Sequence, residues 1–121
     1  MTKTQALQQF FDSFGIPAYP TNSVPTETKF PWLTYEPIVS NWFGQNTVYP
    51  TVSLWYHSTS EKGINEKADE ISKFIGSGHT ITCDDGLIVI YFSGEWIPLV
   101  DEADRTIKRR QTTLQIEFNT L

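Results

Sequence analysis

The spacing of hydrophobic residues changes abruptly within the stretch from Thr51 to Gly76. Apolar and polar side chains alternate from Thr51 to His57, and this two-residue period predicts a strand with one buried face. The next apolar residues recur every three or four positions, which is typical of a helix lying on an apolar surface. They are Ile64, Ala68, Ile71 and Ile75. Ser58 and Glu61 have the spacing of a capping box, so we expect them to begin this helix.

Helical spacing also marks the start of the chain. Apolar residues between Gln5 and Phe14 recur at intervals of three and four, which predicts an amphipathic helix capped by Thr2 or Thr4. The glycine and proline that follow this segment predict its end. The final stretch, from Thr112 to Asn119, alternates instead, and we expect a strand that directs every second side chain into the core.

Two pairs of strand-like segments predict hairpins. The first pair joins residues Trp32–Ser40 to Asn46–His57, with a proline interrupting each strand and an aromatic tip. The second pair joins His79–Cys83 to Leu87–Ser93 through an Asp-Gly turn. We predict that the stretch from Gly94 to Asp104 is a loop with an apolar middle and acidic ends.

The elements therefore follow the order helix, hairpin, helix, hairpin, strand. This order predicts an α+β fold in which two helices pack on one face of a mostly antiparallel sheet. The 121 residues contain no internal repeat, low-complexity tract or linker, so we expect one domain that spans residues 1–121.

Composition narrows the classes of function. The formal net charge of -5 argues against a protein that coats nucleic acid, because counterion displacement needs many cations. The single cysteine excludes an internal disulfide and is compatible with a reducing cytoplasm. The chain starts without the apolar core of a signal peptide, and its longest apolar run is too short to span a bilayer. We therefore expect a soluble intracellular protein.

A search for catalytic motifs yields little. No glycine-rich phosphate loop, paired-cysteine zinc pattern or nucleophile elbow occurs in the sequence. His79, Cys83 and Asp84 carry metal-ligand chemistries, but their spacing matches no closed zinc set. His57 and Cys83 leave open a small thiol or acid-base enzyme, although nothing in the sequence orients that pair. We expect no catalytic residue, no cofactor and no metal.

Bulky side chains at outward positions favour a contact surface instead. Trp55 points away from the predicted buried face, and four tryptophans are many for so short a chain. Burial by the protein's own loops and burial by a neighbouring subunit are both open. The apolar and charged side chains that we expect at interfaces are Trp42, Phe43, Trp55, Glu95, Trp96, Asp101, Glu102, Asp104, Arg105, Lys108, Arg109 and Arg110.

Five segments together resemble the tail terminator, or minor tail, proteins of long non-contractile-tailed bacteriophages. They are FGIPAYPTNSVP (14–25), FPWLTYE (30–36), VSLWYHSTSEKGINEKADEISKFIG (52–76), ITCDDGLIVI (81–90) and IKRRQTTLQIEF (107–118). These segments cover most of the chain. The strand-helix unit carries the strongest part of the resemblance, and its motifs concern packing rather than catalysis.

The resemblance implies an α+β structural subunit that assembles into a six-membered ring. Such a ring caps the completed tail tube at the head-proximal end of the virion, stops polymerisation and offers its other side to the neck proteins. Its implied partners are further copies of itself, the tail tube protein and a head-completion protein, and DNA passes through the lumen without sequence-specific binding. Assembly would take place in the host cytoplasm. A neck or head-completion protein and a generic protein-binding adaptor are the alternatives.

Overall fold

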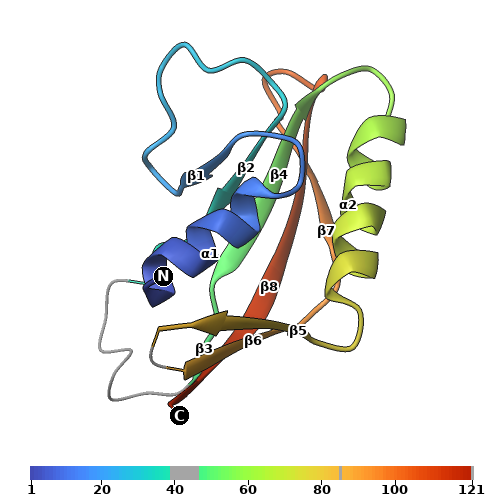
Figure 1. Cartoon of the computed structure of the whole chain (residues 1–121). Helices are drawn as coiled ribbons and strands as arrows, with labels where there is room; N and C mark the ends of the chain where they lie inside the picture. The colour runs from blue at the N-terminus through green and yellow to red at the C-terminus, as the bar shows by residue number, and fades with distance from the viewer. Residues whose placement is uncertain (39–46, 85, 121) are drawn as a thin grey trace.

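One long strand, β8 (Ile107–Thr120), organises the sheet and runs through its full length (Figure 1). The computed structural model describes residues 1–38, 47–84 and 86–120. On one edge, β8 pairs first with β4 (Thr51–His57) and then with β3 (Thr47–Val48). On its other edge, it pairs with β7 (Ile97–Val100) and then with β6 (Gly86–Phe92). All four of these pairings are antiparallel.

Three shorter strands extend the sheet outward from these neighbours of β8. Strand β2 (Trp32–Tyr35) pairs antiparallel with β4, β1 (Ala18–Pro20) pairs parallel with β2, and β5 (His79–Cys83) pairs antiparallel with β6. The strand order along the sheet is β1-β2-β4-β8-β6-β5. The prediction of an α+β fold with a mostly antiparallel sheet is confirmed, and β1–β2 is the parallel pair among the strands of the described ranges.

Helix α1 (Lys3–Asp12) begins and ends two residues earlier than the spacing predicted. Of the two candidate caps, Thr2 is the one used. The Thr2 hydroxyl accepts a hydrogen bond from the Gln5 amide, and the Gln5 side chain accepts one from the Thr2 amide. This capping box satisfies two of the amides that a helix start leaves without partners.

Helix α2 (Lys62–Ile75) starts without the predicted capping box. The Ser58 hydroxyl accepts instead from the Ser60 amide, and the Ser60 hydroxyl accepts from the Lys62 amide. The prediction that Ser58 and Glu61 cap the helix was wrong, because neighbouring serines compete for the same amides through short local hydrogen bonds. The predicted end is confirmed, since Gly76 has a positive φ of 55° just after Ile75.

Both helices cover the same face of the sheet. The buried side chains of α1, α2 and the inner sheet face form one hydrophobic cluster, as the predicted stripes require. The sheet contributes Leu33, Val52, Leu54, Cys83, Ile88, Ile90, Leu114, Ile116 and Phe118 to this cluster. The four apolar residues of the predicted α2 stripe are all buried.

Two sequence predictions about connections were wrong. The stretch from Gly94 to Asp104 is not a loop throughout, because β7 lies within it and pairs with β8. The first hairpin is shorter than predicted, because β2 ends at Tyr35 and the segment Thr47–Val48 pairs with β8 rather than with β2. Local patterns show which segments can extend but not which neighbour supplies their hydrogen bonds.

Candidate functional site

The outer face of the sheet, opposite the helices, carries one row of large side chains across four strands. In the strand register, Trp32 of β2 lies beside Trp55 of β4, Trp55 beside Arg109 of β8, and Arg109 beside Leu99 of β7. Residues directly opposite each other in paired strands direct their side chains to the same face. We refer to Trp32, Trp55, Arg109 and Leu99 as the outer row.

The flat groups of this row stack against one another. The Phe30 and Trp32 ring centroids are 4.2 Å apart, those of Trp32 and Trp55 are 6.4 Å apart, and the Arg109 guanidinium carbon lies 4.5 Å from the Trp55 ring centroid. The tryptophans are consequently half-buried. The question left open by the sequence is answered in part, because these side chains cover much of one another's surface.

Hydrogen bonds hold the stack in place. The Trp55 indole N–H donates to the Thr34 hydroxyl at 2.9 Å, and Arg109 donates to the Ser53 hydroxyl through Nε at 3.3 Å and Nη2 at 3.2 Å. Burial lowers the pKa of Arg109 from its ordinary value, because partial loss of water disfavours the charged form. Arginine nevertheless stays protonated at neutral pH.

Arg109 separates two hollows on this face. The larger has a volume of about 550 Å³, and its walls include Asn22, Trp32, Thr34, Ser53, Trp55 and Arg109. We call it the outer groove. The smaller, of about 200 Å³, lies on the β7 side and is lined by Trp55, Leu99, Val100, Asp101, Ile107 and Arg109.

Strand β7 is the most exposed apolar element of the sheet. Ile97 is 57% exposed, Leu99 36% and Val100 37%. The amide of Asp101 donates to the Ile107 carbonyl, so the alternating pattern of an antiparallel pair directs the amide side of Pro98 towards the free edge. Proline there costs no hydrogen bond to β8 and impedes the addition of another strand. Contacts with a partner would therefore use the side chains of β7.

The acidic turn after β7 is exposed and internally bonded. Asp101 accepts hydrogen bonds from the amides of Ala103 and Asp104. Hydrogen bonds from the Thr106 hydroxyl and amide lower the pKa of Asp104. Predicted interface residues that are exposed in this turn are Asp101, Glu102, Asp104 and Arg105. Glu95, which precedes β7, is also exposed, and Lys108 is half-buried.

Two other predicted interface residues face the interior of the subunit. Arg110 is only 6% exposed, donates to Asn65 Oδ1 from Nε and Nη2, and lies 3.3 Å from a Glu61 carboxylate oxygen. Trp96 is half-buried against the core and donates to the Ser72 hydroxyl. Arg110 and Trp96 therefore hold α2 against the sheet, and the prediction that they face a neighbour is corrected. Trp42 and Phe43 lie outside the described residues.

The sequence contained a signal that predicts opposite directions for the side chains of Arg109 and Arg110. The alternation of Thr112–Asn119, extended a few residues towards the N-terminus, places even-numbered residues inward and odd-numbered ones outward. The structure follows this parity from Ile107 onward, so Arg110 faces α2 and Arg109 faces the outer groove. The contributions of Thr34 and Ser53 to the site depend on register, which the sequence did not reveal.

The structure does not bring the predicted thiol and imidazole together. His57 lies beside Ile107, the first residue of β8, whereas Cys83 lies beside Gly86, which pairs with Thr120 at the other end of β8. A strand of 14 residues spans roughly 45 Å. Within the described ranges, no three His, Cys, Asp or Glu side chains gather closely enough to hold a metal ion.

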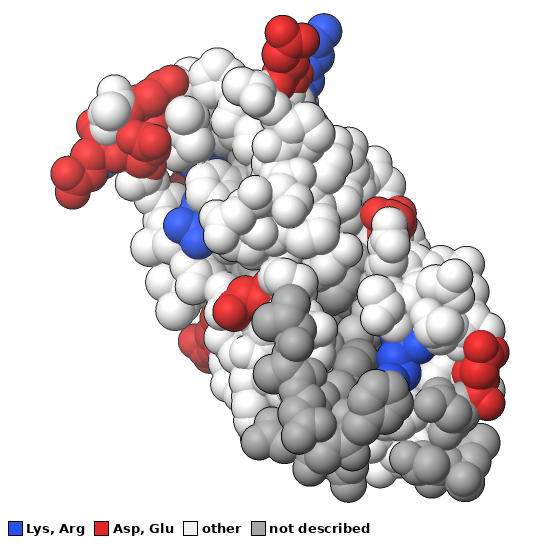
Figure 2. All heavy atoms as spheres, turned by 90° about the vertical axis from the view of Figure 1, so that its left-hand side faces the viewer, with Lys and Arg blue, Asp and Glu red and all other residues white. Residues whose placement is uncertain are grey.

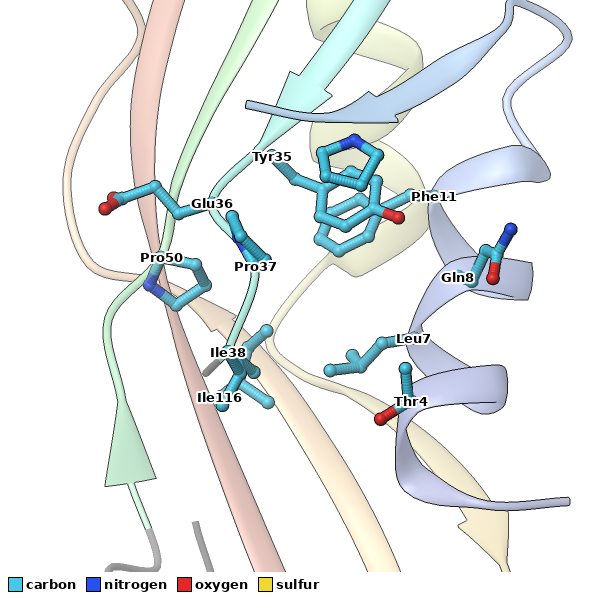
Figure 3. A pocket seen from close by; sticks show the side chains of 11 residues that line it. Thr4, Leu7, Gln8, Phe11, Tyr35, Glu36, Pro37, Ile38, Pro50 and Ile116 are labelled. Atoms are coloured by element: carbon cyan, nitrogen blue, oxygen red, sulfur yellow. The ribbon is translucent and has the colours of Figure 1, made fainter. Parts of the chain in front are cut away.

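A third hollow of about 210 Å³ lies between α1 and the end of β2 (Figure 3). Leu7 and Phe11 project into it from α1, and the Phe11 ring stacks on Tyr35 with centroids 4.3 Å apart. Its lining also includes Ile38, which is the last residue described before position 47. We assign this hollow no role.

Comparisons with known proteins identify no relative from which a function could be inferred. No protein-family model matches the chain, and no curated protein matches it. In the part of the chain that the structure describes, neither helix has the length and hydropathy needed to cross a bilayer. The resemblance to tail terminators therefore rests on the sequence segments named above.

Proposed function

We propose that this protein is a structural subunit that caps the completed tail tube of a long-tailed bacteriophage as a ring. The observation that carries the proposal is the exposure of Ile97 and Leu99 on the outer face of β7, beside Arg109. These two side chains lie on the same face as Gln111 and Arg109, and exposed apolar side chains that share a face are typical of a surface that is covered in an assembly. Tryptophan and arginine beside them have the composition of interface hot spots. The sequence segments that resemble tail terminators support this particular assembly.

In this proposal the protein has no catalytic activity and binds no cofactor. It acts by geometry: a closed ring on the last tube ring leaves no surface for the next tube subunit, and its other side offers a platform for the neck. Head-to-tail contacts between identical copies close into a ring when the rotation between neighbours completes a circle. The acidic balance of the chain would repel DNA from the wall of a central channel.

A phage lacking the gene tests the role in tail assembly. We expect tails of abnormal length and few joined heads, because nothing would stop tube polymerisation or connect the tube to the neck. Electron microscopy of lysates measures both outcomes, and the gene supplied in trans should restore normal virions. Tails of normal length that lack heads would favour the alternative of a neck protein. Normal virions would contradict both functions.

Leu99→Asp tests the contact surface on the purified protein. We expect self-association to weaken by at least about tenfold, because a charge would enter an apolar contact. The melting temperature should stay nearly unchanged, since Leu99 is already 36% exposed. Mass photometry and thermal unfolding measure the two effects. Tyr49→Asp is the matched control, because Tyr49 is 59% exposed but does not belong to β7. Equal assembly of both variants would exclude β7 from the interface.

A further inference from the structure

Two buried hydroxyl groups in the wall of the outer groove have hydrogens left to donate. Ser53 is 3% exposed and Thr34 is 7% exposed. The Ser53 oxygen accepts from Arg109, and the Thr34 oxygen accepts from Trp55. Within the described ranges, neither hydroxyl donates a hydrogen bond to a protein group. Each therefore donates to solvent or to a ligand that occupies the groove.

Arg109 adds a cation to these two donors. Its Nε and Nη2 atoms are used on Ser53, and its flat face is stacked on Trp55. No carboxylate of the described chain lies within ion-pair distance of its guanidinium. A half-buried arginine without a counter-ion is completed best by an anion that accepts several hydrogen bonds at once.

The donors select a carboxylate among possible anions. Ser53, Thr34 and Arg109 all present hydrogens, and a carboxylate has acceptors alone. A single cation suits one carboxylate better than a polyphosphate, because Glu36 in the same groove would repel every negative charge beyond the one paired with Arg109. The formal net charge of the chain is -5, and the side of the molecule shown in Figure 2 carries more acidic than basic side chains, so nucleic acid is a disfavoured ligand. Exposed edges of tryptophan rings carry partial positive charge and favour oxygen atoms.

The surroundings of Arg109 indicate what carries the carboxylate. The smaller hollow on the other side of the Trp55–Arg109 stack is lined by Leu99, Val100 and Ile107. An extended protein segment can place a carboxylate at Arg109 and an apolar side chain in this hollow. We propose that the outer groove binds an extended segment of a different protein that places one carboxylate at Arg109, Ser53 and Thr34. This inference goes beyond the proposed function and does not require a tail.

Peptide titration of the isotope-labelled protein tests the site. The probe is a pentapeptide of alternating leucine and glutamate with both ends blocked, and its matched control carries glutamine in place of glutamate. We expect saturable shifts of the Arg109 Nε–H and Trp55 indole N–H resonances, and at least about tenfold weaker binding of the glutamine peptide. Equal binding of the two peptides, shifts confined to other surfaces, or no saturable shift up to about 5 mM peptide would overturn the proposal.

Three variants separate the groove from general electrostatics. Arg109→Gln should weaken binding of the glutamate peptide by at least about tenfold, and Arg109→Lys should give an intermediate loss, because lysine keeps the charge but not the planar fork. Arg105→Gln removes the same charge from an exposed site outside the groove and should leave binding unchanged. An equal loss in Arg105→Gln would contradict the proposal.

Self-association distinguishes this inference from the ring. If Arg109→Gln prevents the protein from associating with itself and the peptide does not bind, the groove holds a second copy, and a separate acidic partner is excluded. If the unchanged protein binds the peptide and never self-associates, the groove is supported and the ring is contradicted. Sedimentation velocity on the same samples provides this measurement.

Discussion

Ile71→Asp should leave most of the protein unfolded at room temperature. Ile71 is 3% exposed and lies in the middle of the apolar stripe of α2. An unpaired carboxylate at this position would cost several kcal/mol, about half or more of the stability of a typical domain. Circular dichroism and urea titration would measure the loss. We expect the variant to lose cooperative unfolding rather than to rearrange, because α2 packs on β4, β6 and β8 together.

Lys62→Asp is the matched control for this prediction. It introduces the same carboxylate into the same helix, but the Lys62 side chain is 81% exposed. Its ion pair with Glu66 is 4.0 Å long and exposed, so its loss should change stability by no more than about 0.5 kcal/mol. If the Ile71→Asp protein is folded and has the same melting temperature as the Lys62→Asp protein, the α2 stripe does not form the core.

Arg110→Ala should lower the free energy of unfolding by about 2–3 kcal/mol. The change would remove two hydrogen bonds to Asn65 Oδ1 and leave a gap between β8 and α2. The ion pair with Glu61 should contribute little of this loss, because the Glu61 side chain is 53% exposed and water can replace its partner. Thermal and urea unfolding would measure the effect.

Two further variants locate the cause. Arg110→Met keeps much of the side-chain volume but removes the hydrogen bonds, so it should recover only the packing part of the loss. Arg105→Ala removes an exposed arginine and should leave stability unchanged within about 0.5 kcal/mol. If Arg110→Ala keeps its melting temperature but no longer self-associates, Arg110 belongs to the interface between subunits, as the sequence predicted, and does not stabilise the fold.

Periodicity predicted the elements in which buried residues recur at a regular spacing along the chain. The stripe of α2 and the alternation from Leu114 to Phe118 both specify which side chains face inward, because the geometry of a helix or strand fixes this direction locally. Their agreement with the single core cluster confirms the fold class. The Ser58 cap failed for the opposite reason: several hydroxyls were within reach of the same amides, and small energies decided between them.

Strand β7 shows where local patterns were insufficient. Its sequence, Ile-Pro-Leu-Val, contains a proline and no alternation, so it read as a loop. It is a strand because β8 offers a free edge at Arg109 and Gln111, and because the register leaves Pro98 without a required amide hydrogen bond. The exposed surface that supports the proposed function thus depends on the pairing of β7 with β8, which the local sequence of β7 does not reveal.

The sequence alone determined the α+β class, the inner faces of α2 and β8, and the acidic balance of the chain. These properties depend on residue type and on spacing within one element. Only the tertiary structure decided that Trp32, Trp55, Arg109 and Leu99 share a row, and that Ser53 and Thr34 line the groove beside it. Their positions depend on register between strands distant in sequence, which hydrogen bonding and packing of the whole sheet select together.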